Sequence, residues 1–337
     1  MALIKASAST DQGVLQTIDD EVAALRTLIT SMNRQRNSFA RISCLPPEIL
    51  SRIFSFLAVI NVPTGYNFSP KSVGQKLGWI RVSHVCSYWR EVALKDPTLW
   101  RCIPFLLGSQ WVAEALVRAK GAPLIIDIKD QFHDKERARS FISSTLPHLS
   151  HVQCLKLSGS TTQFLSAIQS LTLPAPIIDS IDLQFSGEDI VLHLPPGLFA
   201  QHAPRLRTAL FDDVKATWSS PILRNLTTLS ISLSQRKVSP SNLPSPSEFF
   251  EAMSNMPHLE HLTIRHSLPR PLTAISHGYS LTVTLHRLMS LTLEDTWFSS
   301  MAALQIIRFP STTDLDLGLT LAQNTRETNN ILPRILQ

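Results

Sequence analysis

The chain has 337 residues, of which 44% are apolar and 17% are charged, and its formal net charge is +5. This length allows two or three folded units, and the apolar fraction argues against a disordered chain. Because the sequence has neither a run of 18 apolar residues nor a signal-peptide pattern, we expect a cytoplasmic or nuclear protein that makes no membrane contact.

The positive charge is concentrated in one part of the chain. Residues 34–101 carry a net charge of +7, residues 1–33 carry −2, and residues 102–337 carry zero. A basic segment suits an acidic protein partner or nucleic acid. No aromatic residues are interleaved with the basic ones as in a nucleic-acid interface, so a protein partner is favoured and no nucleic acid is expected.

Residues that could support catalysis or metal binding form no recognisable motif. The sequence has no phosphate-binding glycine loop, no nucleophile elbow and no Cys-x-x-Cys pair. The four cysteines lack paired spacing and are expected to be reduced, two of them at core positions. His258, His261 and His266 form the densest histidine cluster but lack further ligands for a tetrahedral zinc site. We expect no cofactor, no metal and no enzymatic activity.

Residues 1–38 are predicted to form an N-terminal amphipathic or coiled-coil-like helix followed by a polar linker at 33–38. Six apolar residues follow the 3–4 spacing of a heptad seam: Leu15, Ile18, Val22, Leu25, Ile29 and Met32. Such a stripe can pair with a second helix or pack against the rest of the chain. Because fewer than three heptads are marginal in isolation, packing within the chain is the favoured interpretation.

Residues 39–104 are predicted to form a small helical unit. A first helix begins at the prolines of Leu45-Pro46-Pro47-Glu48-Ile49-Leu50, where a first helical turn tolerates proline. A Pro/Gly-containing surface loop is expected at 59–78. A second helix should carry its apolar residues at Val82, Val85, Cys86, Trp89 and Ala93, and should end at Asp96-Pro97.

The order of these motifs resembles an F-box. Three motifs that rarely coincide follow one another: Leu-Pro-Pro-Glu-Ile-Leu, Val-Ser-x-Val-Cys-x-x-Trp-Arg and Pro-x-Leu-Trp. The whole resembles F-box proteins of mushroom-forming fungi. The resemblance implies docking to a Skp-type adaptor and, through it, to a cullin of a ubiquitin ligase. The adaptor-binding residues it implies are Leu45, Pro46, Pro47, Glu48, Ile49, Ile53, Phe54, Val82, Cys86 and Trp89.

Residues 105–337 are predicted to form an irregular leucine-rich-repeat domain. A helix at 111–119, a strand at 124–128 and a helix from 130 precede seven copies of an apolar-x-x-apolar-x-apolar element. The central positions of these copies are separated by 26, 28, 20, 33, 29 and 24 residues, mostly within the range of leucine-rich repeats. A Pro/Ser-rich loop at 239–247 accounts for the longest step, and no capping repeat is recognised at the end.

In such strands the residue between the paired apolar positions points to the concave face. The target-binding residues predicted there and at the next outward positions are Lys156, Asp182, Leu210, Asp212, Arg265 and Glu294. The expected fold is therefore α+β: an N-terminal helix, a small helical F-box-like unit and a leucine-rich-repeat half-solenoid. The expected function is that of a substrate receptor in a Skp–cullin–F-box ubiquitin ligase, and the alternative is a non-ligase interaction scaffold that has kept the motif.

Overall fold

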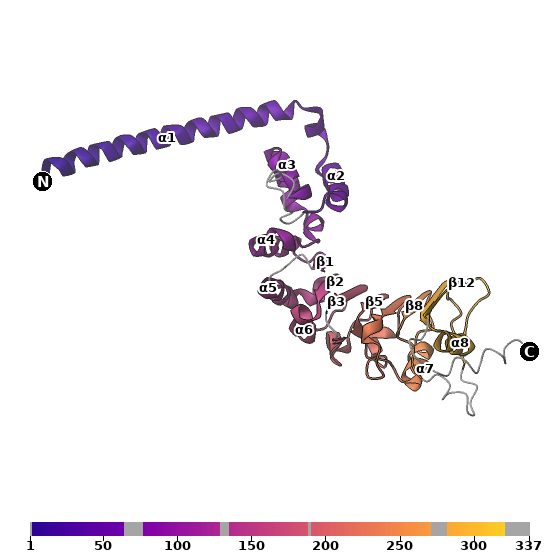
Figure 1. The fold of residues 1–337 in the computed structure, drawn as a ribbon. Coiled ribbons are helices and arrows are strands. Elements are labelled where there is room, and N and C mark those ends of the chain that lie inside the picture. Colours follow the sequence, from indigo (N-terminus) through magenta and orange to yellow (C-terminus); the bar gives the residue numbers. More distant parts are fainter. Residues whose placement is uncertain (1, 64–76, 129–134, 188–189, 271–281, 321–337) are drawn as a thin grey trace, which may run out of the picture. The chain divides into compact units, whose positions relative to one another are not determined.

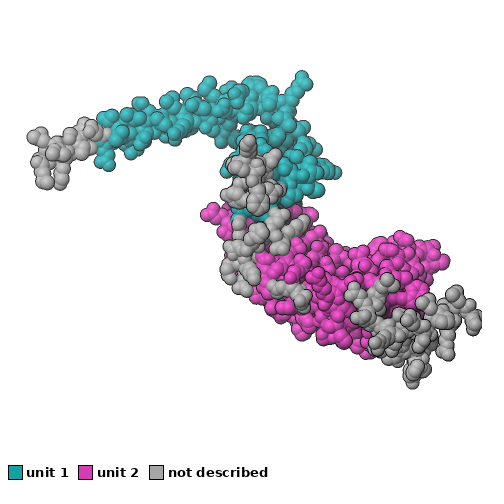
Figure 2. All heavy atoms as spheres, viewed as in Figure 1, with its two compact units in different colours: residues 1–100, 106–108, 117–120 teal, residues 101–105, 109–116, 121–337 magenta. Residues whose placement is uncertain are grey.

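The computed structural model describes residues 2–63, 77–128, 135–187, 190–270 and 282–320, with only the helical backbone described at 2–11 and 135–139. The chain divides into two compact units (Figure 2). Unit 1 contains residues 1–100, 106–108 and 117–120, and unit 2 contains the remainder. Among the described residues, no helix combines the length and the apolar composition needed to cross a bilayer.

Unit 1 begins with a long helix. Figure 1 shows α1 (Ala2–Ser38) as a single uninterrupted helix. The prediction of a linker at 33–38 was wrong, because the helix continues to Ser38 before a 3₁₀ turn at Arg41–Cys44. Arg34, Gln35 and Arg36 lack an apolar period, but arginine and glutamine are good helix formers and extend the helix without burying a face.

The F-box-like part of unit 1 consists of two α-helices and 3₁₀ turns. Helix α2 (Pro47–Ile60) begins at the predicted prolines, and α3 (Ser87–Lys95) ends at Asp96. The single second helix predicted from residue 82 is instead divided into a 3₁₀ turn at Gly78–His84 and α3. Cys86, whose backbone is extended (φ −156°, ψ 170°), separates the two pieces, and it is half-buried rather than in the core.

The ends of the loop between α2 and the 3₁₀ turn are joined. The backbone N–H of Trp79 donates to the carbonyl of Asn61 at 2.8 Å. Gly78 has φ +53°, and a Cβ atom there would lie 2.4 Å from the Asn61 carbonyl oxygen, so only glycine fits this approach. Most of the predicted loop, residues 64–76, lies outside the described residues.

Unit 2 is built on a parallel sheet (Figure 1). Its eight strands lie in the order β1-β2-β3-β5-β7-β8-β10-β12. They are β1 (Leu124–Ile128), β2 (Val152–Ser160), β3 (Ser180–Ser186), β5 (Thr208–Asp212), β7 (Thr228–Ser232), β8 (His261–Arg265), β10 (Ser290–Thr296) and β12 (Asp314–Thr320). The strand predicted at 124–128 and the strands predicted from the seven repeated elements are confirmed. Two short parallel pairs accompany the sheet: β4 (Leu192–His193) with β6 (Val214–Lys215), and β9 (Val283–Thr284) with β11 (Ile307–Arg308).

Helix α4 (Ser109–Ala119) precedes β1, and other helices occupy connections between the strands. They are α5 (Lys135–Thr145), α6 (Thr161–Gln169), α7 (Pro246–Ser254) and α8 (Trp297–Ile306). The predicted helix at 111–119 is confirmed as α4. The Pro/Ser-rich segment leads into α7, where Ser245 and Glu248 form a reciprocal capping box. Residues 321–337, whose sequence shows no recognisable capping repeat, lie outside the described residues.

The core of unit 2 lies on one face of the sheet. Alternate residues of the central strands are buried, and two rows of apolar side chains run across it through Leu155, Ile181, Leu229 and Leu262, and through Leu157, Leu183, Ile231 and Ile264. Each such side chain contributes about 1.5–3 kcal/mol when it is fully buried. Helix α6 contacts β2, and α8 contacts β10 and β12. The intervening side chains are therefore left on the opposite face, called here the outer face.

Candidate protein-binding surfaces

The F-box-like helices are held by a compact aromatic core. The Phe54 ring packs on Trp89 at a centroid distance of 5.2 Å, and Trp79 meets Trp100 edge-on at 5.1 Å. The indole N–H of Trp100 donates to the Ala93 carbonyl at 2.8 Å, which ties the 3₁₀ turn at Pro97–Trp100 to α3. These contacts fix α2 and α3 relative to each other.

A carboxylate connects the end of α3 to α2. Asp96 accepts hydrogen bonds from the Ser51 hydroxyl, from the Thr98 N–H at 2.9 Å and from the Thr98 hydroxyl at 2.7 Å. Burial favours the neutral acid, but these hydrogen bonds outweigh it and lower the pKa of Asp96 below its ordinary value. The ionised form of Asp96 is therefore the one that holds the helices together.

One face of α2 presents apolar side chains to solvent. Ile49, Ile53, Phe56 and Ile60 follow helical spacing and are 46%, 39%, 62% and 78% exposed. Val85, in the break before α3, is also exposed. A contiguous apolar stripe of this kind is typical of a protein-binding surface rather than of a free surface.

The residues assigned to adaptor binding from the sequence are divided between this surface and the core. Pro46, Pro47, Glu48, Ile49 and Ile53 are exposed. Leu45, Cys86 and Trp89 are half-buried, and the Leu45 carbonyl accepts the Tyr88 hydroxyl at 2.8 Å. Phe54 and Val82 are buried, so they support the surface from beneath without reaching a partner.

Two exposed residues of α2, Phe56 and Ile60, were not among the predicted adaptor-binding residues. Both extend the Ile49–Ile53 spacing by further helical turns. Between Ile53 and Ile60 the sequence contains one polar residue, Ser55. The composition of this segment therefore does not show which face of the helix is exposed.

The outer face of the sheet in unit 2 carries polar residues in two aligned rows. The first row crosses all eight strands through directly paired residues, and it contains Asp127, Lys156, Asp182, Leu210, Ser230, Thr263, Thr292 and Asp316. The second row contains Ser158, Gln184, Asp212, Ser232, Arg265 and Glu294. All six residues predicted to bind a target therefore lie in these two rows.

The first strands place a lysine between two aspartates. Lys156 is paired in register with Asp127 on one side and with Asp182 on the other. Together with Ser158 and Gln184 they line a pocket of about 200 Å³, in which Gln184 Nε2 donates to Asp182 at 3.0 Å. The two aspartates beside Lys156 make this end of the outer face mixed in charge.

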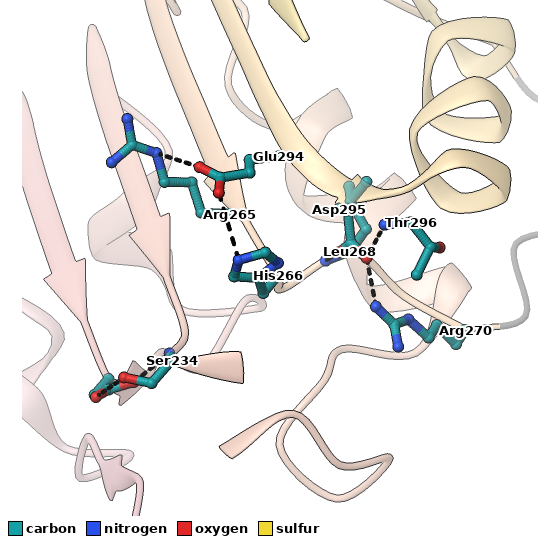
Figure 3. A network of polar contacts seen from close by, with 9 residues as sticks. Ser234, Arg265, His266, Leu268, Arg270, Glu294, Asp295 and Thr296 are labelled. Atoms are coloured by element: carbon teal, nitrogen blue, oxygen red, sulfur yellow. Dashed lines mark hydrogen bonds and ion pairs between the residues drawn. The ribbon is translucent and has the colours of Figure 1, made fainter. Parts of the chain in front are cut away.

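Arg265 and Glu294, on neighbouring strands, pair with each other (Figure 3). Arg265 Nε lies 3.3 Å from Glu294 Oε2, and His266 Nε2 lies 3.6 Å from Glu294 Oε1. The positive charge of Arg265 is therefore accompanied by a carboxylate, and His266 lies beside the same carboxylate.

Asp213, in the turn after β5, takes part in a buried ion pair. Asp213, with φ +56°, accepts the Ser234 N–H at 2.6 Å and the Ser234 hydroxyl at 2.5 Å. Lys237 Nζ lies 3.0 Å from Asp213 Oδ2, and both side chains are almost fully buried. The preceding residue, Asp212, has its pKa raised, first by burial and then by the negative charge of Asp213.

A second buried carboxylate, Asp295, organises the loop after β8 (Figure 3). Its oxygens accept the N–H groups of Leu268 at 3.2 Å and Thr296 at 2.7 Å, together with an Arg270 guanidinium N–H. Neither Asp213 nor Asp295 was identified from the sequence as a structural residue. Each lies four positions after the central apolar residue of its repeat, and this shared position was the available signal.

Within the described part of the chain, no group of three or more histidine, cysteine, aspartate or glutamate side chains is arranged to hold a metal ion. The chemistry that the two surfaces offer is recognition: an apolar helical face in unit 1, and charged and polar rows on a rigid sheet in unit 2.

Comparison with known proteins identifies part of unit 1. Residues 42–105 match the family model described as F-box-like. No curated protein matches the chain. The segment that contains α2, the 3₁₀ turn at 78–84 and α3 is therefore an F-box-like domain, which indicates a role in F-box-mediated protein interaction.

Proposed function

We propose that this protein is the substrate-recognition subunit of a Skp–cullin–F-box ubiquitin ligase. In this role the F-box-like domain binds a Skp-type adaptor, and the adaptor binds a cullin. The observation that carries the proposal is that the F-box-like match coincides with the exposed apolar face of Ile49, Ile53, Phe56 and Ile60. F-box domains typically bind such adaptors, and this face is an apolar surface that the described part of the domain leaves uncovered.

The target would bind to the outer face of unit 2, which we propose to be an irregular leucine-rich-repeat half-solenoid. Two features support this assignment. Strands β2 to β12 of the sheet follow one another in chain order and are all parallel, and the repeated apolar elements place their buried positions in register. Stacked strand-containing repeats of this kind bury a shared core and present an extended binding surface.

The chain would contribute binding and proximity rather than chemistry. Holding a target near a charged ubiquitin-conjugating enzyme raises the effective concentration of the target lysine, which accelerates transfer without a catalytic group on the receptor. Recognition by unit 2 would rest on short-range contacts, since residues 102–337 carry no net charge to steer a partner from a distance.

The test is co-purification of the full chain with a Skp-type adaptor and a cullin. Ile53→Asp, which places a charge on the apolar face of α2, should reduce recovery of the adaptor at least tenfold. The matched control is Ser55→Asp, because Ser55 is exposed on the same helix but lies about 120° away from this face. Equal recovery with both variants would remove this face from adaptor binding. Adaptor binding without a cullin would favour the scaffold function instead.

A further inference from the structure

The apolar stripe of α1 is not covered by the described part of the chain. Its six seam residues, Leu15, Ile18, Val22, Leu25, Ile29 and Met32, are between 37% and 63% exposed. Val14 and Leu28, next to the seam, are 55% and 57% exposed. Packing of this stripe against the F-box-like domain, favoured from the sequence, is not observed. A stripe of this extent on one helix indicates a partner surface.

The heptad positions of the stripe suit pairing of two parallel helices. With Leu15, Val22 and Ile29 at the a positions, the d positions are Ile18, Leu25 and Met32. β-branched residues therefore occupy two of the three a positions, and Leu25 occupies the central d position. This combination favours a parallel two-stranded coiled coil.

The charges beside the seam are complementary to a second copy of the same helix. In this register Glu21 is a g position and Arg26 is the e position of the following heptad, the two positions that meet across a parallel pair. Within one helix they cannot meet, because five residues correspond to a rotation of about 140°. Neither residue has an opposite charge three or four positions away in its own helix.

We propose that α1 forms a parallel coiled coil with α1 of a second copy of this chain, joined by the a/d seam and by two symmetric Glu21–Arg26 pairs. The a and d residues of one copy can pack against the same residues of the other, and Glu21 of each copy can pair with Arg26 of the other. A twofold symmetric interface requires such self-complementarity. The resulting dimer carries two F-box-like domains and two outer faces. This inference does not depend on adaptor binding.

The first experiment measures the mass of the full chain by sedimentation equilibrium over a range of concentrations. The wild type should reach the mass of a dimer. Leu25→Asp, which places a charge in the seam, should remain a monomer at every concentration. Thr27→Asp adds the same charge at the f position, opposite the seam, and should dimerise like the wild type. A wild type that stays monomeric, or equal behaviour of the two variants, would overturn the proposal.

A charge exchange then tests orientation. Glu21→Lys and Arg26→Glu should each raise the dimer dissociation constant roughly tenfold, because each replaces two attractive pairs by two repulsive ones. The double variant should regain wild-type affinity, and a mixture of the two single variants should form heterodimers. In an antiparallel pair Arg26 would instead face Asp19. Weakening by Asp19→Lys without weakening by Glu21→Lys would therefore overturn the parallel arrangement.

Discussion

Arg265 Nε on β8 and Glu294 Oε2 on β10 lie 3.3 Å apart, so two residues that were expected to face a target separately form a pair on adjacent strands. Both side chains remain partly exposed, and an exposed pair of this kind contributes about 0–1 kcal/mol to stability. A bound segment would therefore meet the pair as a unit, and either partner could exchange its contact for one with the target.

The outer face is expected to determine which proteins are captured. Charge reversal at Asp182, Asp212 and Arg265 should abolish target capture while leaving the fold intact, because all three side chains lie on the outer face and surface substitutions usually change stability by less than about 0.5 kcal/mol. The measurement is proximity labelling in cells with wild type and triple variant. Glu251→Lys, on the exposed side of α7, is the control. An unchanged set of labelled proteins would exclude the outer face as the target site.

Replacing Gly78 by alanine should destabilise the F-box-like domain. The left-handed backbone costs a non-glycine residue about 1–3 kcal/mol, and the new Cβ would collide with the Asn61 carbonyl. The melting temperature of the full chain and its recovery with the adaptor should both fall. Gly121→Ala is the control, since no atom lies within 4 Å of a Cβ placed there. If the two variants melt alike, the closure at Gly78 does not contribute to stability.

Removing the buried cation of the Asp213–Lys237 pair should destabilise unit 2 strongly. Lys237→Met leaves the Asp213 carboxylate buried without its cation, which typically costs about 3–5 kcal/mol. The double variant with Asp213→Asn, which retains a residue that tolerates positive φ, should be more stable than Lys237→Met alone. Urea unfolding of the variants measures this. A double variant less stable than the single one would show that the unpaired charge is not the cause.

The raised pKa of Asp212 predicts a pH-dependent stability effect. Because the native pKa exceeds the unfolded value, the folded state favours the protonated form, and the stability contributed by that proton is lost as pH rises through the native pKa. Asp212→Asn should therefore raise the free energy of unfolding at pH 7, and with it the melting temperature. The gain should be less than about 1 kcal/mol, since the group is partly exposed. The difference should disappear below the unfolded pKa of about 3.9. An equal difference at both pH values would point to another cause.

The strands of unit 2 were predictable because their buried positions are occupied by apolar residues, which gives the repeated pattern apolar-x-x-apolar-x-apolar. The F-box-like helices were likewise marked by prolines and apolar spacing. The break at Cys86 was not, since its extended backbone is one that any residue can adopt. The closure at Gly78 was not either, because the presence of a glycine does not show that its backbone takes a positive φ or which carbonyl it approaches. The same limit applies to partners far apart in the sequence: Lys237 meets Asp213 only because the fold brings the turn at Gln235–Lys237 against the turn that follows β5.

The uninterrupted register from β2 to β12 sets a length scale for recognition. Neighbouring strands are about 4.8 Å apart, so corresponding positions of one row on alternate strands are roughly 9.6 Å apart. A polyproline II segment advances about 9.3 Å in three residues, whereas side chains on one side of a β-strand recur every two residues, about 6.7 Å. A polyproline-like segment lying across the strands would place every third residue over an alternate strand of the outer face. A target bound in this way would show its sequence specificity at every third residue.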